Sequence, residues 1–383
     1  MTKNKIIITC PKSIPPFLKE ELCLLKFPII SESIGAVETE GTLEQAMILN
    51  LYLRTGHKVL FFLKEFRAKT PDELYQQVIK ISWENYIEQD GYISVISSVD
   101  NPTIKDSRFA NVKCKDAIVD RIMDKYKQRP YSGPRKNKAV IFLYWKQDQC
   151  SIYLDTSGEP LSKRGYRKIP FTAPMQETLA AAVIMATGWR GRGNFINPMC
   201  GSGTLAIEAA LIALGKAPGL LRSNYAFLHL KGFNKDFWRE QRTKARSAAK
   251  KSITGKIIAT DINPRAIEAA KKNAATAGVD HLIEFNICHF SDTIIPVGGG
   301  VVMLNPEYGE RLGKQEELED VYSGIGDYFK QKCKGYTGYI FTGNPDLAKK
   351  IGLRAKRKIP FFNSKIECRL LEYELYEGSR KRG

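Results

Sequence analysis

The second half of the chain alternates short apolar segments with helical segments, and this alternation constrains its fold more than any other feature. Five apolar segments are predicted to be strands: 194–197, 256–261, 282–287, 301–305 and 338–342. Helices are predicted over 176–186, 205–214 and 265–277. Such an alternation predicts a parallel, doubly wound α/β sheet. Two last segments, near 359–362 and 366–376, have no helix between them and predict an antiparallel pair at the sheet edge.

The first 155 residues have a different pattern, typical of two small α+β units. Strands and helices are predicted in turn over 4–60, and the second unit has helices near 74–81 and 109–126 with strands near 91–98, 139–145 and 149–155. A linker rich in glycine, proline and basic residues follows. We therefore predict domains at 1–64, 65–155 and 173–383, joined by a linker at 156–172.

The chain is strongly basic, which points to a polyanionic partner. It has 59 Lys and Arg against 41 Asp and Glu, a net charge of +18, and phosphate neutralisation is a common use of such an excess. Basic residues concentrate at 231–256 and 349–358. A third cluster interleaves cations with aromatic rings, as a single-stranded or irregular nucleic acid requires; membrane binding is the weaker alternative, because no cluster lies on a strongly apolar amphipathic helix. The RNA-binding candidates in it are Lys127, Arg129, Tyr131, Arg135 and Lys136.

Several other classes of protein are disfavoured. The longest apolar run, 179–187, is far shorter than the roughly 20 residues of a membrane helix, and the first residues lack a signal peptide's apolar stretch. The eight cysteines form no C-x-x-C pair, and the four histidines are scattered. We expect a reduced, cytoplasmic protein with no membrane contact and no metal; the oligomeric state stays open.

The turn after strand 194–197 predicts a nucleotide-type ligand site. Gly201-Ser202-Gly203 lies there, and glycines at the end of a first strand let a ligand approach the backbone closely. The second strand ends at Asp261, whose carboxylate could accept hydrogen bonds from both ribose hydroxyls. Together these features predict an adenosine-containing cofactor, although Asp261 alone could merely cap the helix that follows.

The fourth strand ends in Asn305-Pro306-Glu307-Tyr308-Gly309, a set that suits methyl transfer to an exocyclic amine. Such a nitrogen is conjugated to its ring and is a poor nucleophile. The Asn305 side chain and the Pro306 carbonyl could accept its two N–H bonds and draw its lone pair out of the ring plane. Tyr308 could stack on the extruded base. We therefore take Asn305, Pro306 and Tyr308 as catalytic candidates.

These motifs, in this order, resemble those of the bacterial THUMP-domain RNA methyltransferases, a group also labelled putative N6-adenine-specific DNA methylases. The chain is similar to the RlmL-like 23S rRNA guanine-N2 methyltransferases, over essentially its whole length. The segments that carry the resemblance are 155–158, 163–167, 173–180, 197–204, 217–219, 261–263 and 305–312.

The resemblance implies a ferredoxin-like domain, a THUMP domain and a Rossmann-like domain that binds S-adenosyl-L-methionine (SAM). It places Asp261 at the SAM ribose, Asp292 near the adenine amino group and the segment 173–178 against the methionine end. The implied cofactor-binding residues are Ala173, Pro174, Gln176, Glu177, Thr178, Asn197, Gly201, Ser202, Gly203, Thr204, Asp261, Ile262, Asp292 and Asn305.

Two positions depart from the family pattern. Asn197 stands where the family has Asp, and Glu307 stands where it has a second Pro. An amide can still accept a bond from the methionine ammonium, without charge assistance. Glu307 could accept the N1–H and amino N–H of guanine, or it could face solvent.

The leading hypothesis for function is SAM-dependent methylation of a guanine N2 amine in 23S rRNA. SAM would supply the activated methyl group and the protein would supply alignment. The alternatives are a tRNA guanine-N2 methyltransferase, an adenine-N6 nucleic-acid methylase and a non-catalytic RNA-binding factor in ribosome assembly.

Overall fold

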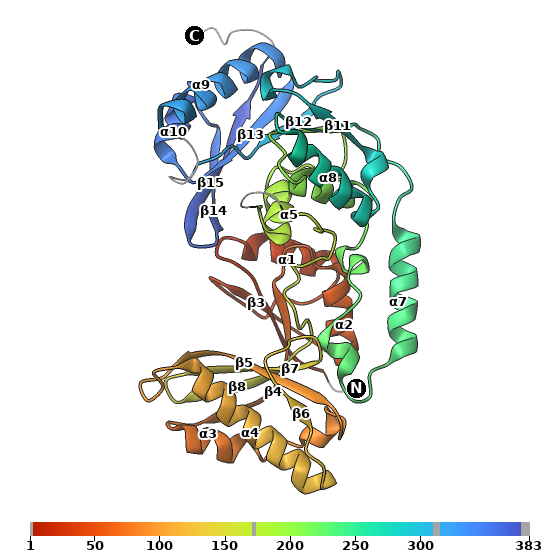
Figure 1. Cartoon of the computed structure of the whole chain (residues 1–383), viewed down its shortest axis with the longest axis vertical. Coiled ribbons are helices and arrows are strands. Elements are labelled where there is room, and N and C mark those ends of the chain that lie inside the picture. Colours follow the sequence, from red (N-terminus) through yellow and green to blue (C-terminus); the bar gives the residue numbers. More distant parts are fainter. Residues whose placement is uncertain (1–2, 171–173, 309–314, 377–383) are drawn as a thin grey trace. The chain divides into compact units, whose positions relative to one another are not determined.

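The structure is a computed structural model, and it describes residues 3–170, 174–308 and 315–376 (Figure 1). The described residues divide into two compact units. The first unit takes in residues within 1–10, 18–163 and 222–244, and the second takes in residues within 11–17, 164–221 and 245–383.

One eight-stranded sheet forms the body of the first unit, in the order β2-β3-β1-β4-β8-β7-β5-β6. Its strands are β1 Asn4–Thr9, β2 Ser31–Ser33, β3 Ala36–Gly41, β4 Lys58–Arg67, β5 Tyr92–Asp100, β6 Tyr131–Ser132, β7 Ala139–Lys146 and β8 Gln149–Asp155. The two predicted α+β units therefore share a sheet, because β4 pairs antiparallel with β8. The predicted domain boundaries stay predictions.

The helices along the same stretch of the sequence are α1 Pro15–Leu24, α2 Leu43–Tyr52, α3 Pro71–Val78 and α4 Ser107–Tyr126; the first three residues of α1 belong to the second unit. Local sequence explains where α2 and α3 begin. Thr42 and Gln45 form a reciprocal capping box at the start of α2, and Thr70 caps α3 ahead of Pro71. Such caps satisfy backbone N–H groups that have no partner within the helix.

A seven-stranded sheet forms the body of the second unit, in the order β11-β10-β9-β12-β13-β15-β14. Its strands are β9 Asn194–Pro198, β10 Ile257–Asp261, β11 Ile283–Ile287, β12 Gly300–Leu304, β13 Tyr336–Thr342, β14 Arg357–Asn363 and β15 Ile366–Glu374. The five strands from β9 to β13 are parallel, and β15 runs antiparallel to β13 and β14. The predicted sheet and its antiparallel edge are confirmed.

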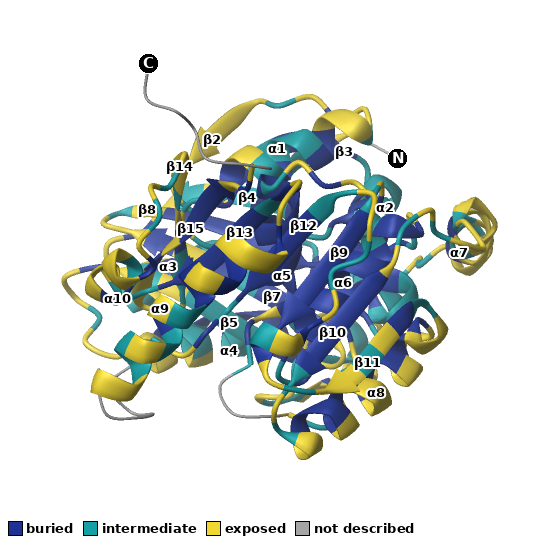
Figure 2. Ribbon diagram, turned by 90° about the horizontal axis from the view of Figure 1, so that it is seen from above, coloured by how far each residue is buried: buried dark blue, intermediate teal, exposed yellow. Residues whose placement is uncertain are grey.

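The later helices are α5 Glu177–Ala186, α6 Thr204–Ala213, α7 Lys235–Ala248, α8 Pro264–Ala277, α9 Gln315–Lys332 and α10 Pro345–Lys350. Short 3-10 turns lie at Trp83–Asn85, Pro218–Leu221, Ala226–His229, Asp280–Leu282 and Phe290–Asp292. The central strands β9, β10 and β12 are buried (dark blue in Figure 2). Parallel strands covered on both faces read as continuous apolar runs, which is why the sequence reveals them.

The strand order reverses at β9, which lies between β10 and β12. In open α/β sheets, ligands bind outside the carboxyl ends of the strands at such a switch point. A ligand site is therefore expected where the turn after β9, the end of β10 and the end of β12 meet.

Two features are absent from the described parts of the chain. No helix there combines the length and the apolar content needed to cross a membrane. Those parts also hold no group of three or more His, Cys, Asp or Glu placed to bind a metal ion.

Candidate functional site

The turn between β9 and α6 has a backbone that glycine makes possible. Gly201 and Gly203 have φ of 54° and 83°, in the left-handed region that residues with a Cβ seldom adopt. A Cβ on Gly203 would also lie 2.9 Å from the Cβ of Ala270 in α8. The turn thus combines tight packing of α6 against α8 with open space beside the half-buried Gly201, where an added Cβ would meet no described atom within 4 Å.

Asp261 is held against this turn at the end of β10. Its Oδ2 accepts the backbone N–H of Gly201 at 2.9 Å, and its Oδ1 accepts the N–H of Asn263 at 2.9 Å. An ionised carboxylate has about four lone-pair sites, so acceptor capacity remains for hydroxyl donors. Asp261 does not cap α8, because Asn263 is the N-cap and its side chain accepts the N–H of Arg265.

Asn197 bridges the switch point from within β9. It is fully buried, and its Nδ2 donates to the carbonyl of Met303 in β12 at 2.9 Å. Only the NH₂ group can donate to a carbonyl, so the amide's orientation is fixed. Its Oδ1 is a buried acceptor that no group in the described residues satisfies.

The segment that follows β12 holds the catalytic candidates. Asn305 is half-buried and Pro306 is buried, whereas Glu307 is exposed. The Asn305 Oδ1 is buried and accepts no hydrogen bond from the described part of the chain. The Glu307 carbonyl accepts the Tyr322 hydroxyl at 3.3 Å, which ties this segment to α9. The rest of the motif, 309–312, lies outside the described residues.

Tyr308 is half-buried and held by the β14–β15 hairpin. Its hydroxyl accepts the Nδ2 of Asn363 at 2.9 Å, and its ring meets Phe341 edge to face, with centroids 6.3 Å apart. Burial raises the pKa of the Tyr308 phenol, so the side chain is neutral at physiological pH. Its ring is therefore positioned by contacts at both its edge and its hydroxyl.

The segment predicted to contact the methionine end of SAM leads into α5. Glu177 and Thr178 are buried, Pro174 is half-buried and Gln176 is exposed, while Ala173 lies outside the described residues. Burial raises the pKa of the Glu177 carboxyl, and the nearby Arg167 opposes this effect. The Thr178 Oγ1 has no hydrogen-bond partner in the described residues.

Arg167 links this segment to α6, a role that sequence reasoning missed. Its Nη2 donates to the Met175 carbonyl at 2.6 Å and to Thr204 Oγ1 at 3.0 Å, and it lies 3.6 Å from Glu177 Oε1. The buried pair Arg164–Glu208, with Nε and Oε1 2.8 Å apart, lies one helical turn further along α6. The only signal in the sequence was the basic motif at 163–167, and nothing in it says that these charges are buried.

A second residue that sequence reasoning missed is Asn273 of α8. Its Oδ1 accepts the backbone N–H groups of Lys168 and Ile169, at 2.9 and 3.1 Å, and its Nδ2 donates to the Ser202 carbonyl at 3.2 Å. Ser202 itself is buried. Asn273 therefore fastens the linker to the Gly-Ser-Gly turn.

The two candidates for the adenine end are both exposed. Ile262 follows Asp261 directly and is 66% exposed. Asp292 lies in the short 3-10 turn after β11, with its Oδ1 3.4 Å from the Ser291 hydroxyl. An exposed apolar side chain and an exposed carboxylate fit a flat ring that carries an amino group.

The RNA-binding candidates lie together in the first unit, between α4 and β7. We call Lys127, Arg129, Arg135 and Lys136 the α4–β7 loop cations. Lys127 ends α4 in a left-handed conformation, with φ of 57°. Tyr131 is 70% exposed, and all of the loop cations are exposed except the half-buried Lys136.

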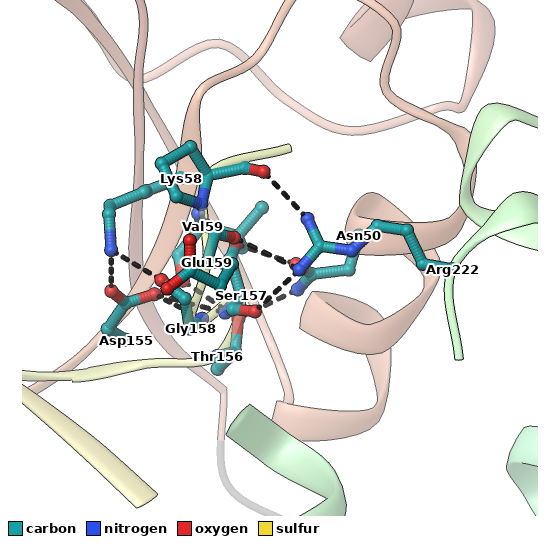
Figure 3. Close-up of polar contacts among 10 residues, drawn as sticks. Asn50, Lys58, Val59, Asp155, Thr156, Ser157, Gly158, Glu159 and Arg222 are labelled. Atoms are coloured by element: carbon teal, nitrogen blue, oxygen red, sulfur yellow. Dashed lines mark hydrogen bonds and ion pairs between the residues drawn. The ribbon is translucent and has the colours of Figure 1, made fainter. Parts of the chain in front are cut away.

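The segment at 155–158, which carries part of the family resemblance, forms a buried polar cluster in the first unit (Figure 3). Lys58 forms an ion pair with Asp155. The Ser157 hydroxyl donates to Asn50 Oδ1 at 2.7 Å and accepts the backbone N–H of Val59 at 2.9 Å. These contacts hold the end of β8 against α2 and β4, so the motif has a structural explanation in this chain.

The strand order, the glycine turn after β9 and the acid that ends β10 define a Rossmann-like methyltransferase fold. The predicted fold class is confirmed. The chain belongs to the family described as RMKL-like, methyltransferase domain, whose model matches residues 164–372. A THUMP domain matches residues 68–155, and an RlmL ferredoxin-like domain matches residues 5–60. The resemblance stated from the motifs is confirmed.

Individual relatives agree with this assignment. The chain is 32% identical to the putative RNA methyltransferase slr0064 of Synechocystis sp., over 98% of each chain. It is 37% identical to the ribosomal RNA large subunit methyltransferase K/L of Syntrophotalea carbinolica, over 97% of this chain and 54% of the relative. The chain thus spans about half the length of the K/L relatives that it matches.

Among solved structures, the putative methyltransferase SMU.472 in complex with SAH is similar along its whole length. It superposes with a TM-score of 0.90 at 28% identity, and the match covers 99% of this chain and 100% of that chain.

Proposed function

We propose that this chain is a SAM-dependent RNA methyltransferase that acts on the exocyclic N2 amine of a guanine in 23S rRNA. The observation that carries the proposal is the Asn305 Oδ1, a buried acceptor at the end of β12 with no partner in the described residues. The bound SAH of SMU.472 supports the cofactor, since SAH is what SAM becomes after losing its methyl group. The THUMP match and the names of the relatives support an RNA substrate, which would place the reaction in the cytoplasm.

The residues around the switch point fit SAM. Asp261 keeps acceptor capacity for ribose hydroxyls after binding two backbone amides, and Gly201 leaves the backbone open to a close approach. The Asn197 Oδ1, buried and unpartnered in the described residues, could accept a bond from the methionine ammonium. Ile262 and Asp292 would lie at the adenine ring. Bound SAM would supply a methyl group activated by its sulfonium.

The residues after β12 would prepare the acceptor nitrogen. The Asn305 Oδ1 and the Pro306 carbonyl would each accept one N–H of the amine, which turns the nitrogen lone pair out of the base plane. Tyr308, held by Asn363, would stack on the base and exclude water. Methyl transfer makes the nitrogen cationic and acidic, so its proton can leave to solvent without a strong general base.

The choice of guanine rests on the resemblance to the RlmL-like guanine-N2 methyltransferases, which the match to an RlmL ferredoxin-like domain supports. Glu307 would add to it only if its side chain faced the base. Guanine offers N1–H beside its amine, whereas adenine has an acceptor at N1. Glu307 is exposed next to the catalytic candidates. If its carboxylate turned toward the base, it would attract the N1–H and amine of guanine and repel the N1 acceptor of adenine.

The test is nucleoside mass spectrometry on rRNA and tRNA, from cells with and without the gene and from purified RNA treated with the protein and SAM. The proposal expects N2-methylguanosine to be lost from 23S rRNA without the gene and restored by the protein. If N2-methylguanosine were lost from tRNA instead, the substrate would be a tRNA guanine. If N6-methyladenosine were lost, the substrate would be an adenine. No change in any methylated nucleoside, with no SAM binding by the protein, would leave only the non-catalytic RNA-binding alternative.

A further inference from the structure

Helix α7 presents a row of cationic side chains along one face. Lys235, Arg239, Arg242 and Arg246 lie at positions i, i+4, i+7 and i+11, which share one side of an α-helix. At 1.5 Å per residue the row extends over about 16 Å, with neighbours separated by about 4.5–6 Å along the axis. All except the half-buried Arg242 are exposed, and α7 is drawn mainly in yellow in Figure 2. We call this row the α7 ridge.

The side of α7 that adjoins the ridge next to Arg242 is anchored by an aromatic cluster of the first unit. Trp238 is buried and meets Tyr225 and Phe227 edge to face, with centroids 5.5 and 4.9 Å apart. Tyr225 and Phe227 stack on one another at 5.0 Å, and the Arg242 guanidinium lies 5.5 Å over the Trp238 ring. The apolar side of this part of α7 is therefore already covered.

Arg222 fastens the start of the same segment (Figure 3). Its guanidinium donates to the carbonyls of Ser157, Glu159 and Pro160 at 3.2, 3.0 and 2.9 Å, and its own carbonyl accepts Nη1 of Arg242 at 3.2 Å. The ridge therefore begins on a segment that is fixed to the residues following β8, and it does not need to be ordered when a ligand arrives.

The helix that carries the ridge has more basic than acidic residues. The helix has five basic and two acidic residues, and both acids form exposed pairs within the helix, Asp236 with Arg239 and Glu240 with Lys244. Exposed pairs of this kind are weak. Lys235 and Arg246 form no ion pair with any acidic residue in the described part of the chain. No acidic residue occurs anywhere from 241 to 256.

We propose that the α7 ridge binds the phosphate backbone of the RNA substrate, as a contact surface additional to the α4–β7 loop cations. The proposal rests on the proposed function in taking RNA as the substrate. A preformed row of cations at regular spacing suits a regularly charged backbone, and each cation that meets a phosphate releases condensed counterions. An anionic membrane is a poorer occupant, because a membrane-binding helix needs a free apolar face and the Trp238 side of α7 is covered.

The test measures how RNA binding depends on salt. The triple variant Lys235→Gln, Arg239→Gln, Arg246→Gln is compared with the wild type for binding to protein-free 23S rRNA at several KCl concentrations. Each lost phosphate contact lowers the slope of log K against log[salt] by about 0.7–0.9. The variant should lose about two units of slope and bind about 100-fold more weakly at 0.15 M salt, since each contact is worth about 5-fold there. The single variants Lys235→Gln and Arg246→Gln should each lower the slope by about 0.7–0.9 and weaken binding at 0.15 M salt by about 5-fold.

A matched control removes the same charge from other exposed helix positions, with Lys271→Gln, Lys330→Gln and Lys332→Gln, and should keep the wild-type slope. Equal slopes for the ridge variant and the wild type would overturn the proposal, and so would an equal fall in the control. Loss of binding to phosphatidylglycerol vesicles by the ridge variant, with an unchanged RNA slope, would assign the ridge to a lipid surface and reject RNA. SAM affinity, measured on the same proteins, separates this proposal from the proposed function: a wild type that binds no SAM refutes the function whatever the ridge does.

Discussion

The Asn197→Asp substitution is the sharpest test of how the switch point is built, because it installs the residue of the family pattern. In this chain Asn197 is fully buried and donates to the Met303 carbonyl at 2.9 Å. An ionised Asp has no proton to donate. Its oxygen would face the Met303 carbonyl oxygen, and that acceptor would lose its partner.

The variant has two ways to relieve this conflict, and both reduce stability. If the new carboxyl stays ionised, the unsatisfied Met303 acceptor costs about 1–3 kcal/mol, and burying the charge adds to that. If the carboxyl is protonated, it can donate to Met303, but holding it neutral costs about 1.4 kcal/mol for every pH unit above the unfolded pKa of about 3.9. That cost is about 2 kcal/mol at pH 5.5 and about 4 kcal/mol at pH 7.

The sign of the pH dependence follows from linkage. The folded-state pKa of the new carboxyl is raised above its unfolded value, so the unfolded state releases the proton first. The variant is therefore close to wild type below about pH 4 and loses stability as pH rises. The loss grows until the ionised form becomes the less costly of the two.

The assay is thermal unfolding of both proteins without SAM, at pH 5.5 and pH 8. At about 2–4 °C for each kcal/mol in a unit of this size, the Tm should fall by about 4–8 °C at pH 5.5 and by more at pH 8. The control Asn286→Asp makes the same change at an exposed position of β11 and should stay within about 0.5 kcal/mol. A Tm difference between Asn197→Asp and wild type that is the same at both pH values would refute the reasoning.

Four further predictions concern the site and the RNA surface. Asn305→Ala should reduce turnover by about 10²–10³-fold, the usual effect of removing one transition-state hydrogen bond, and should weaken SAM binding far less than it lowers turnover; undiminished turnover would contradict its role. Asp261→Ala should weaken SAM binding by about 1–3 kcal/mol, and calorimetry showing unchanged affinity would move the ribose contact elsewhere. Replacing the four α4–β7 loop cations by Ala should lower the salt slope of RNA binding by about 0.7–0.9 per lost contact, and a wild-type slope would leave that loop a solvated surface. Because Glu307 is exposed, Glu307→Pro should leave turnover on the cognate RNA equal or higher, and a clear slowing would mean that its carboxylate reads guanine.

The strands of the second unit could be predicted from sequence because burial on both faces makes them continuous apolar runs. The predicted strand at 194–197 is β9, Asn194–Pro198, and the predicted strand at 256–261 is β10, Ile257–Asp261. Several elements were not predicted, among them α7, α9, α10 and β6, and two of these omissions have a clear physical reason. α7 has few apolar residues, and its anchor, Trp238, packs on an aromatic cluster that sequence does not reveal. β6 has only two residues, which is too short for a sequence pattern to predict a strand. It forms a strand because it pairs with β5.

The sequence by itself determined the chemistry that each segment could supply: a glycine turn after β9, an acid at the end of β10 and an amide at the end of β12. Only the tertiary structure decided how these groups are used. The hydrogen bond from Asn197 to Met303 joins residues that are 106 positions apart in the sequence. The hydrogen bond from Gly201 to Asp261 joins residues that are 60 positions apart. Hydrophobic periodicity fixes which residues face a core, but it does not fix strand order or register. Hydrogen bonds between distant segments depend on both, and so do the buried charges around Arg167 and the anchoring of α7.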